Sequence, residues 1–273
     1  MRFLGPIQGI LGIMISFGLI VALVLKHVNY GFALTIGAVI LGLFFGFTPK
    51  DLLDTALFTL TDLTTIELAI IIALIPILAK SMEDTKLMEN LIKGLKGRLS
   101  PRVILATIPA VLGLLPMMGG ALLSAPLIDD EANKLGVSSE KKSVINLWFR
   151  HIWFYASPIS STLIIMEKMT GVRFYDVILV NLPTFFFHIV VGYFLIIRPI
   201  RNVGDKASDT GLWFNLVKGS TPIALTILSN IAGVPLTVSL LLGIVSAFIL
   251  GRFDFKRSVK TVKNGFQWKL VAA

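Results

Sequence analysis

The amino-acid sequence predicts an all-α, polytopic membrane protein with about eight spans and one re-entrant helical hairpin. Two observations predict this class. The chain has 273 residues, of which 55% are hydrophobic and only 15% charged, and its mean hydropathy is +0.84. Its apolar residues also gather in runs, and a run of about 20 such residues can cross a bilayer as a helix. We treat residues 1–273 as a single transmembrane domain.

Seven apolar runs follow one another, separated by short charged segments: 4–25, 30–47, 66–79, 103–128, 145–166, 174–197 and 221–250. Gly233-Val234-Pro235 interrupts the last run, which predicts two short spans with a turn between them. Between the third and fourth runs, residues 81–100 place apolar side chains at steps of three and four among lysines and acids. That periodicity predicts an amphipathic helix on the membrane surface.

Composition and absent motifs exclude several functions. The chain has no cysteine, which excludes disulfides, thiolate nucleophiles and cysteine metal sites. It has no Gly-rich phosphate loop, no Gly-x-Ser-x-Gly elbow and no His-Glu-x-x-His pair, so we expect no enzyme activity, no metal site and no cofactor. The net charge of +9 comes from basic residues in loops between apolar runs, where they report membrane topology. We therefore expect no nucleic-acid partner.

The most distinctive stretch is a break in the central run 103–128, which carries Pro116, Gly119, Gly120 and Pro126. Prolines and glycines at membrane depth weaken or remove helical hydrogen bonds, and lipid offers no replacement. Such backbone has to be sheltered in protein or line a wet cavity, and broken segments of this kind mark binding sites in transporters. The simpler alternative is a tight turn that requires positive φ at the glycines.

The distribution of Lys and Arg predicts how this run is threaded, because cytoplasmic loops carry the excess of basic residues. With a re-entrant hairpin, 19 of the 25 basic residues lie on one face and four on the other, namely Arg2, Lys50, Lys168 and Arg173. With a single crossing the split becomes 9 against 14. The re-entrant threading is therefore favoured, and it places the N-terminus outside and residues 81–100 in the cytoplasm.

A second break is expected in the run 145–166, where Pro158 lies among Ser157, Ser160, Ser161 and Thr162. Proline deletes one helical hydrogen bond, and nearby hydroxyls can replace backbone partners, so this helix should unwind there. Four hydroxyls around such a break could ligate a small cation or donate hydrogen bonds to an anion. They could equally hydrogen-bond within the helix.

The two breaks together define one candidate substrate- or ion-binding site, formed by Pro116, Gly119, Gly120, Ser124, Ser157, Pro158, Ser160, Ser161 and Thr162. Three ionisable residues, Arg150, His151 and His188, are candidates for substrate binding or proton coupling. Arg150 could instead extend to the cytoplasmic interface, and His188 could be neutral and bonded to a neighbouring helix.

A weak internal repeat relates Gly31-Phe32-Ala33-Leu34-Thr35 to Gly233-Val234-Pro235-Leu236-Thr237, 202 residues later. The charge distribution has the first copy running outward and the second inward, the inverted relation common in transporters. We assign 1–200 to a first repeat and 212–273 to an incomplete second one. A complete second repeat would extend beyond residue 273, so we expect the chain to be an N-terminal fragment.

Two segments, Leu114-Leu115-Pro116-Met117-Met118-Gly119-Gly120-Ala121-Leu122 and Asn146-Leu147-Trp148-Phe149-Arg150-His151, resemble the ion transporter superfamily of secondary carriers, which includes the divalent-anion/sodium symporters. They look most like an uncharacterised prokaryotic branch, catalogued as a domain of unknown function. The resemblance implies a multi-pass protein of the prokaryotic cell membrane. It also implies a surface helix, a re-entrant hairpin and a broken helix in each inverted repeat, in the order of 81–100, 103–128 and 145–166 here. The Ser-Asn-Thr signature of the dicarboxylate carriers is absent, so neither substrate nor coupling ion carries over.

From these features we expect a secondary active transporter of a small anion or organic acid, coupled to sodium or protons, within the lipid bilayer. The alternatives are a channel-like or non-transporting membrane subunit and, with less support, an intramembrane enzyme. As a fragment, the chain would need its missing C-terminal half, or a second copy in a homodimer, to complete the site.

The charge distribution makes a topology prediction that single cysteines can test, because the chain has none of its own. In intact cells, a membrane-impermeant thiol reagent should label Asp54→Cys, and should label Lys96→Cys and Asn133→Cys only after permeabilisation. Labelling of Asn133→Cys together with Asp54→Cys in intact cells would contradict the re-entrant hairpin.

Overall fold

In the computed structural model every described element is helical, in agreement with the fold class expected from the sequence. The structure describes residues 6–114, 120–157, 159–201 and 211–267, and within them it contains no β-strand. Three of the described helices are long and apolar enough to cross a membrane, namely Ile7–Leu25, Leu63–Asp84 and Phe174–Ile197, and three shorter apolar helices are Tyr30–Phe44, Pro101–Gly113 and Leu236–Gly251. These helices indicate a membrane protein. The number of spans and the re-entrant threading stay predictions.

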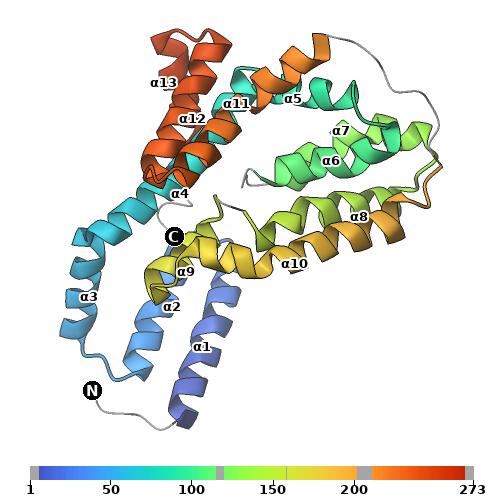
Figure 1. The fold of residues 1–273 in the computed structure, drawn as a ribbon. Helices are drawn as coiled ribbons and strands as arrows, with labels where there is room; N and C mark the ends of the chain where they lie inside the picture. Colours follow the sequence, from blue (N-terminus) through green and yellow to red (C-terminus); the bar gives the residue numbers. More distant parts are fainter. Residues whose placement is uncertain (1–5, 115–119, 158, 202–210, 268–273) are drawn as a thin grey trace. The chain divides into compact units, whose positions relative to one another are not determined.

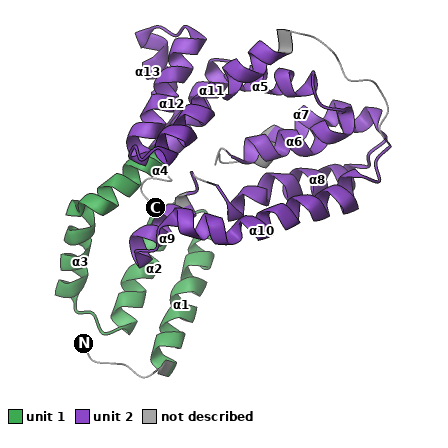
Figure 2. Cartoon of the chain, in the orientation of Figure 1, with its two compact units in different colours: residues 1–73, 267–273 green, residues 74–266 purple. Residues whose placement is uncertain are grey.

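The chain divides into two compact units, residues 1–73 with 267–273 and residues 74–266 (Figure 2). In the first unit, α1 (Pro6–Leu25) and α2 (Tyr30–Phe44) lie side by side (Figure 1). Gly12 and Gly37 lie in this contact, because a Cβ on Gly12 would come within 2.7 Å of Phe44 and one on Gly37 would overlap Ile20. Small residues at such positions let membrane helices approach closely.

The third helix of the first unit, α3 (Pro49–Thr61), begins with a reciprocal cap. The Thr48 hydroxyl accepts a hydrogen bond from the Asp51 N–H at 3.2 Å, and the Asp51 carboxylate accepts one from the Thr48 N–H at 2.8 Å. Hydrogen bonds from Thr48 hold the pKa of Asp51 below its ordinary value. After Asp62, α4 (Leu63–Asp84) begins in the first unit and ends in the second.

In the second unit, α11 (Gly211–Ile231) packs against both α5 (Leu87–Lys96) and α12 (Leu236–Gly251). The amphipathic helix expected over 81–100 is therefore shorter than expected, because residues 81–84 belong to α4 and Lys86, at φ +59°, turns the chain. The apolar face of α5 is also covered by protein: Leu87, Met88, Leu91 and Ile92 are buried, and Gly219 of α11 lies against this face.

The segment after α12 forms a helix that the sequence analysis assigned to a charged loop. This helix, α13 (Phe255–Gly265), is capped by the Asp254 side chain, which accepts a hydrogen bond from the Arg257 N–H at 2.8 Å. Thr261 and Gly265 are its buried residues.

The central and second breaks lie in the remaining elements of the second unit. Helices α6 (Pro101–Gly113), α7 (Gly120–Lys134) and α8 (Ser139–Arg150) pack on one another (Figure 1). They are followed by the 3₁₀ helix η1 (His151–Tyr155), by α9 (Ser161–Thr170) and by α10 (Phe174–Gly192), which continues into the π-helical η2 (Tyr193–Ile197). Asp129, Asp130 and Glu131, expected in a solvated loop, lie instead within α7.

A local structural repeat relates the turn between α1 and α2 to the turn between α11 and α12. The Val28 N–H donates to the Leu23 carbonyl in the first turn, and 206 residues later the Val234 N–H donates to the Ser229 carbonyl. The residue before each donor has positive φ, +60° at His27 and +92° at Gly233. Both turns therefore end a helix by the same left-handed cap.

The repeat continues through the following helix and its end. The Phe47 N–H donates to the Gly42 carbonyl, and 206 residues later the Phe253 N–H donates to the Phe248 carbonyl. Thr48 and Asp254 then cap α3 and α13 by the same hydrogen bond to the third residue. The register expected from the sequence, 202 residues, is wrong, because it pairs Gly31 inside α2 with Gly233 in a turn.

The contact between α5 and α11 makes a stability prediction. A Cβ at Gly219 would lie 2.5 Å from the Leu91 nitrogen and 2.7 Å from the Leu87 carbonyl oxygen, both backbone atoms of α5. Because neither can move alone, Gly219→Ala should destabilise the protein by roughly 1–3 kcal/mol. Unfolding followed by tryptophan fluorescence in detergent would measure the change, since Trp213 lies on α11.

Gly18→Ala is the matched control for this substitution. Gly18 lies within α1 and has no atom within 4 Å of an added Cβ, so the variant should keep or gain stability, by up to about 1 kcal/mol. Equal effects of the two substitutions would mean that α5 and α11 are not closely packed.

Candidate functional site

The structure shows the two legs of the expected hairpin but not its tip. Helices α6 and α7 pack side by side, and Gly120 is the first residue of α7 (Figure 1). Pro116 and Gly119 lie outside the described residues. The candidate site can therefore be built only from the hairpin legs and from the elements that contact them.

The α-helix expected over 145–166 is interrupted. Helix α8 ends at Arg150, η1 covers the next five residues, and α9 begins only at Ser161. Pro158 itself lies outside the described residues. The interruption leaves the C-terminal end of one helix and the N-terminal end of another within one apolar run, and such ends carry partial charges of opposite sign.

The hydroxyls near the interruption have different surroundings. Ser157 is buried, its hydroxyl accepts a hydrogen bond from the Ile159 N–H at 3.4 Å, and its carbonyl accepts one from the Ser160 N–H at 3.3 Å. Ser160 caps α9 without a side-chain hydrogen bond to the helix, and Thr162 is exposed. The side chain of Ser161 lies outside the described part of the structure. Ser157 therefore supports the local backbone, whereas Ser160 and Thr162 are not bound to it.

Three contacts join the hairpin legs to α8 and η1. The Ser124 hydroxyl of α7 donates to the Asn146 side-chain oxygen of α8 at 2.5 Å, and both side chains are buried. The Trp153 ring N–H donates to the Ala110 carbonyl of α6 at 2.5 Å. A Cβ on Gly113 of α6 would overlap the carbonyl oxygen of Arg150, so the two backbones touch. The sequence analysis named Ser124 but not Asn146, and its only signal for Asn146 was a polar residue in an apolar run.

Arg150 is enclosed by protein and is not extended to the surface. Its side chain is in a residue only 9% exposed, and its Nη1 is buried and has no hydrogen-bond partner in the part of the chain that the structure describes. Snorkelling to the interface, the simpler alternative at the level of the sequence, does not account for this burial. A buried cation without a partner is destabilising, because its lost hydration is not replaced.

The two histidines lie near the same interruption. The Nδ1 atom of His151 lies 2.6 Å from the Leu147 carbonyl oxygen, a distance that requires a proton on this nitrogen. The His188 ring of α10 lies against Trp148 and Tyr155, at centroid distances of 4.4 and 5.6 Å. Its Nε2 is buried and has no hydrogen-bond partner among the described residues. The structure thus brings His188 to the end of α8 and to η1.

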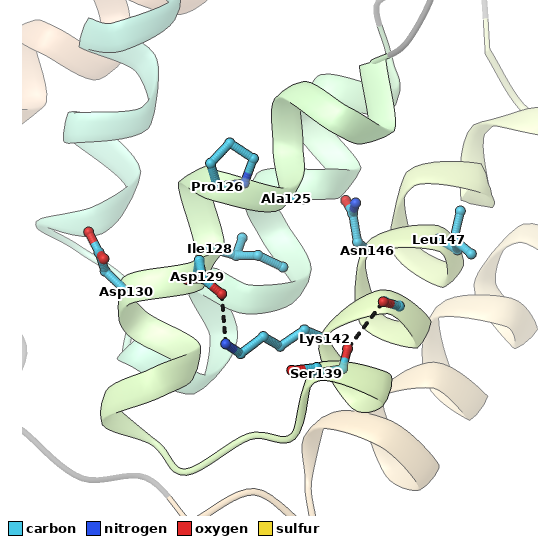
Figure 3. Close-up of a pocket in the computed structure, with 10 residues that line it drawn as sticks. Ala125, Pro126, Ile128, Asp129, Asp130, Ser139, Lys142, Asn146 and Leu147 are labelled. Carbon is cyan, nitrogen blue, oxygen red and sulfur yellow. Dashed lines mark hydrogen bonds and ion pairs between the residues drawn. The ribbon is translucent and has the colours of Figure 1, made fainter.

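A groove of about 680 Å³ lies between α7 and α8 (Figure 3). The Lys142 ammonium lies in it and contacts the Asp129 carboxylate at 2.6 Å and the Asn133 side-chain oxygen at 2.5 Å. The ion pair holds the pKa of Asp129 below its ordinary value. Buried Ile128 and Asn146 also line the groove. The sequence analysis did not identify this groove, because its lining residues come together only when α7 and α8 pack.

Comparison with known proteins identifies a family. No curated protein and no solved structure matches the chain. The family described as "Protein of unknown function (DUF401)" matches residues 10–272, and the match includes both interrupted runs and the local repeat. The chain therefore belongs to this family of proteins of unknown function.

Proposed function

We propose that the chain is a secondary active transporter of a small anion or organic acid, related to the ion transporter superfamily and coupled to sodium or protons. Substrate binds between the hairpin formed by α6 and α7 and the interruption between α8 and α9. Alternating access exposes this site to each side of the membrane in turn, without covalent chemistry.

The burial of Arg150 carries this proposal. Its Nη1 is buried without a hydrogen-bond partner among the described residues, at the residue where α8 ends. A guanidinium presents donors in a planar fork that matches a carboxylate or a similar oxyanion. An anionic ligand would supply the charge and the hydrogen-bond acceptor that this nitrogen lacks.

The local repeat supports the inverted organisation that such transporters use. Two helices with the same caps, α3 and α13, carry different charges: α3 contains Lys50, Asp51 and Asp54, whereas α13 contains Lys256, Arg257, Lys260 and Lys263. Basic segments remain in the cytoplasm. The difference in charge therefore favours opposite membrane faces for the two helices, with the re-entrant hairpin reaching into the membrane from the cytoplasm.

His188 is the proposed proton carrier if protons are the coupling ions. Its imidazole lies against two aromatic rings beside the interruption, and its Nε2 has no hydrogen-bond partner in the described structure. An ionisable group in such a position is functional by default in a membrane protein. Sodium coupling would instead use the carbonyl end of α8 and the hydroxyls of Ser160 and Thr162.

Substitution of Arg150 tests the proposal through two effects of opposite sign. Without ligand, Arg150→Met should raise the thermal stability of the purified full chain, because it removes an uncompensated buried charge; the gain should be of the order of 1–4 kcal/mol. In a screen of small carboxylates and inorganic oxyanions, at least one anion should stabilise the unsubstituted protein and should not stabilise Arg150→Met.

Arg201→Met is the control, since Arg201 is exposed and should change neither measurement. Reconstituted vesicles would then show whether the anion found in this way moves in response to a sodium or proton gradient. A loss of stability in Arg150→Met, with no anion effect on either protein, would assign Arg150 a structural role and remove the support for an anion site.

A further inference from the structure

Helix α13 presents three different faces around its axis. The first is buried and is formed by Thr261 and Gly265. The second is an exposed apolar stripe at helical spacing, formed by Phe255, Val259 and Val262. The third is a basic edge, formed by Lys256, Lys260 and Lys263, all exposed. No acidic residue lies between Phe255 and Gly265.

The buried face holds α13 in a fixed orientation on α4. The Thr261 hydroxyl donates to the Asp84 carboxylate at 2.7 Å. A Cβ on Gly265 would lie 2.9 Å from the Ile77 Cα atom and 3.1 Å from the Lys80 Cβ atom. Because both contacts are on the same side of the helix, rotation of α13 about its axis would break them. The apolar stripe is therefore held in one direction, next to the basic edge.

The exposed stripe is large for a surface free in water. Phe255 is 86% exposed, although a phenylalanine side chain gains about 1.5–3 kcal/mol from full burial. The basic edge argues against a protein partner, because lysine is depleted from the cores of protein interfaces. An apolar stripe bordered by lysines is instead the pattern of helices that lie in the headgroup region of a membrane.

We propose that α13 is a membrane-surface helix that binds anionic phospholipids. The stripe of Phe255, Val259 and Val262 enters the acyl-chain boundary, and Lys256, Lys260 and Lys263 contact the phosphate and headgroup oxygens beside it. Its contacts with α4 tie the lipid-bound helix to one of the three helices long enough to cross the membrane. This inference goes beyond the transport proposal and does not depend on it.

Lipid-specific quenching of a single fluorescent label tests the inference. The chain has no cysteine, so Val259→Cys can be labelled with bimane in the full-length protein and reconstituted into mixed phosphatidylcholine and phosphatidylglycerol vesicles. At equal mole fractions, nitroxide-labelled phosphatidylglycerol should quench this label several-fold more than nitroxide-labelled phosphatidylcholine, because the lysines concentrate the anionic lipid. Aqueous iodide should quench it weakly.

Two controls separate the apolar stripe and the basic edge from the rest of the protein. A label at Asn264→Cys, which is exposed and lies away from the stripe, should be quenched by iodide and only weakly by either lipid. Replacing Lys256, Lys260 and Lys263 by Gln should abolish the preference of the Val259 label for phosphatidylglycerol. Replacing three exposed lysines elsewhere in the second unit, Lys86, Lys93 and Lys134, should leave it unchanged.

Three results would overturn the inference. Equal quenching by the two lipids would remove the anionic preference. Protection from both the lipids and iodide would mean that a protein surface, such as a second copy of the chain, covers the stripe. Strong iodide quenching without lipid quenching would mean that the stripe faces water. All three labels and substitutions are at exposed positions, so each variant should fold as the unsubstituted protein does.

Discussion

The close contact between α6 and the end of α8 is the interaction on which the candidate site depends. Gly113 lets the two backbones touch at the Arg150 carbonyl, and the Trp153 ring N–H binds the Ala110 carbonyl one turn away. Backbone groups at an interrupted helix have no partners in lipid, so they have to find them in protein. The hairpin leg supplies this shelter. Without it, neither the interruption between α8 and α9 nor the burial of Arg150 would be tolerated.

Several features of the fold could be predicted from the sequence, and they share a local cause. Apolar runs predict helices, and Gly233-Val234-Pro235 predicts the turn between α11 and α12 because it removes helical hydrogen bonds. Other features depend on contacts between distant segments. The α5 periodicity is the same whether lipid or α11 covers its apolar face, and only Gly94 and Gly219 hinted at a close neighbour. Likewise, α13 reads as a charged loop until α4 holds one face of it.

The register of the repeat could not be found by residue identity, for a physical reason. Apolar helices draw on few residue types, so short matches arise by chance, whereas the caps are set by hydrogen bonds that different residues can make. His27 and Gly233 adopt the same left-handed turn, and Thr48 and Asp254 make the same cap. The similarity between the two segments therefore resides in the hydrogen bonds at helix ends. The charges that follow these caps differ, which is the difference expected for helices on opposite membrane faces.

The energetics of Arg150 decide between a structural and a functional role. Its position at the C-terminal end of α8 is favourable for a cation, but the helix dipole contributes only about 0.3–1 kcal/mol at such sites. Burying an ion costs several kcal/mol even after the protein relaxes, which is of the order of half the stability of many domains. The dipole therefore offsets only a small part of the cost. The remainder is offset only when a second charge is present, and since no described side chain bonds the buried nitrogen, that charge has to come from a ligand.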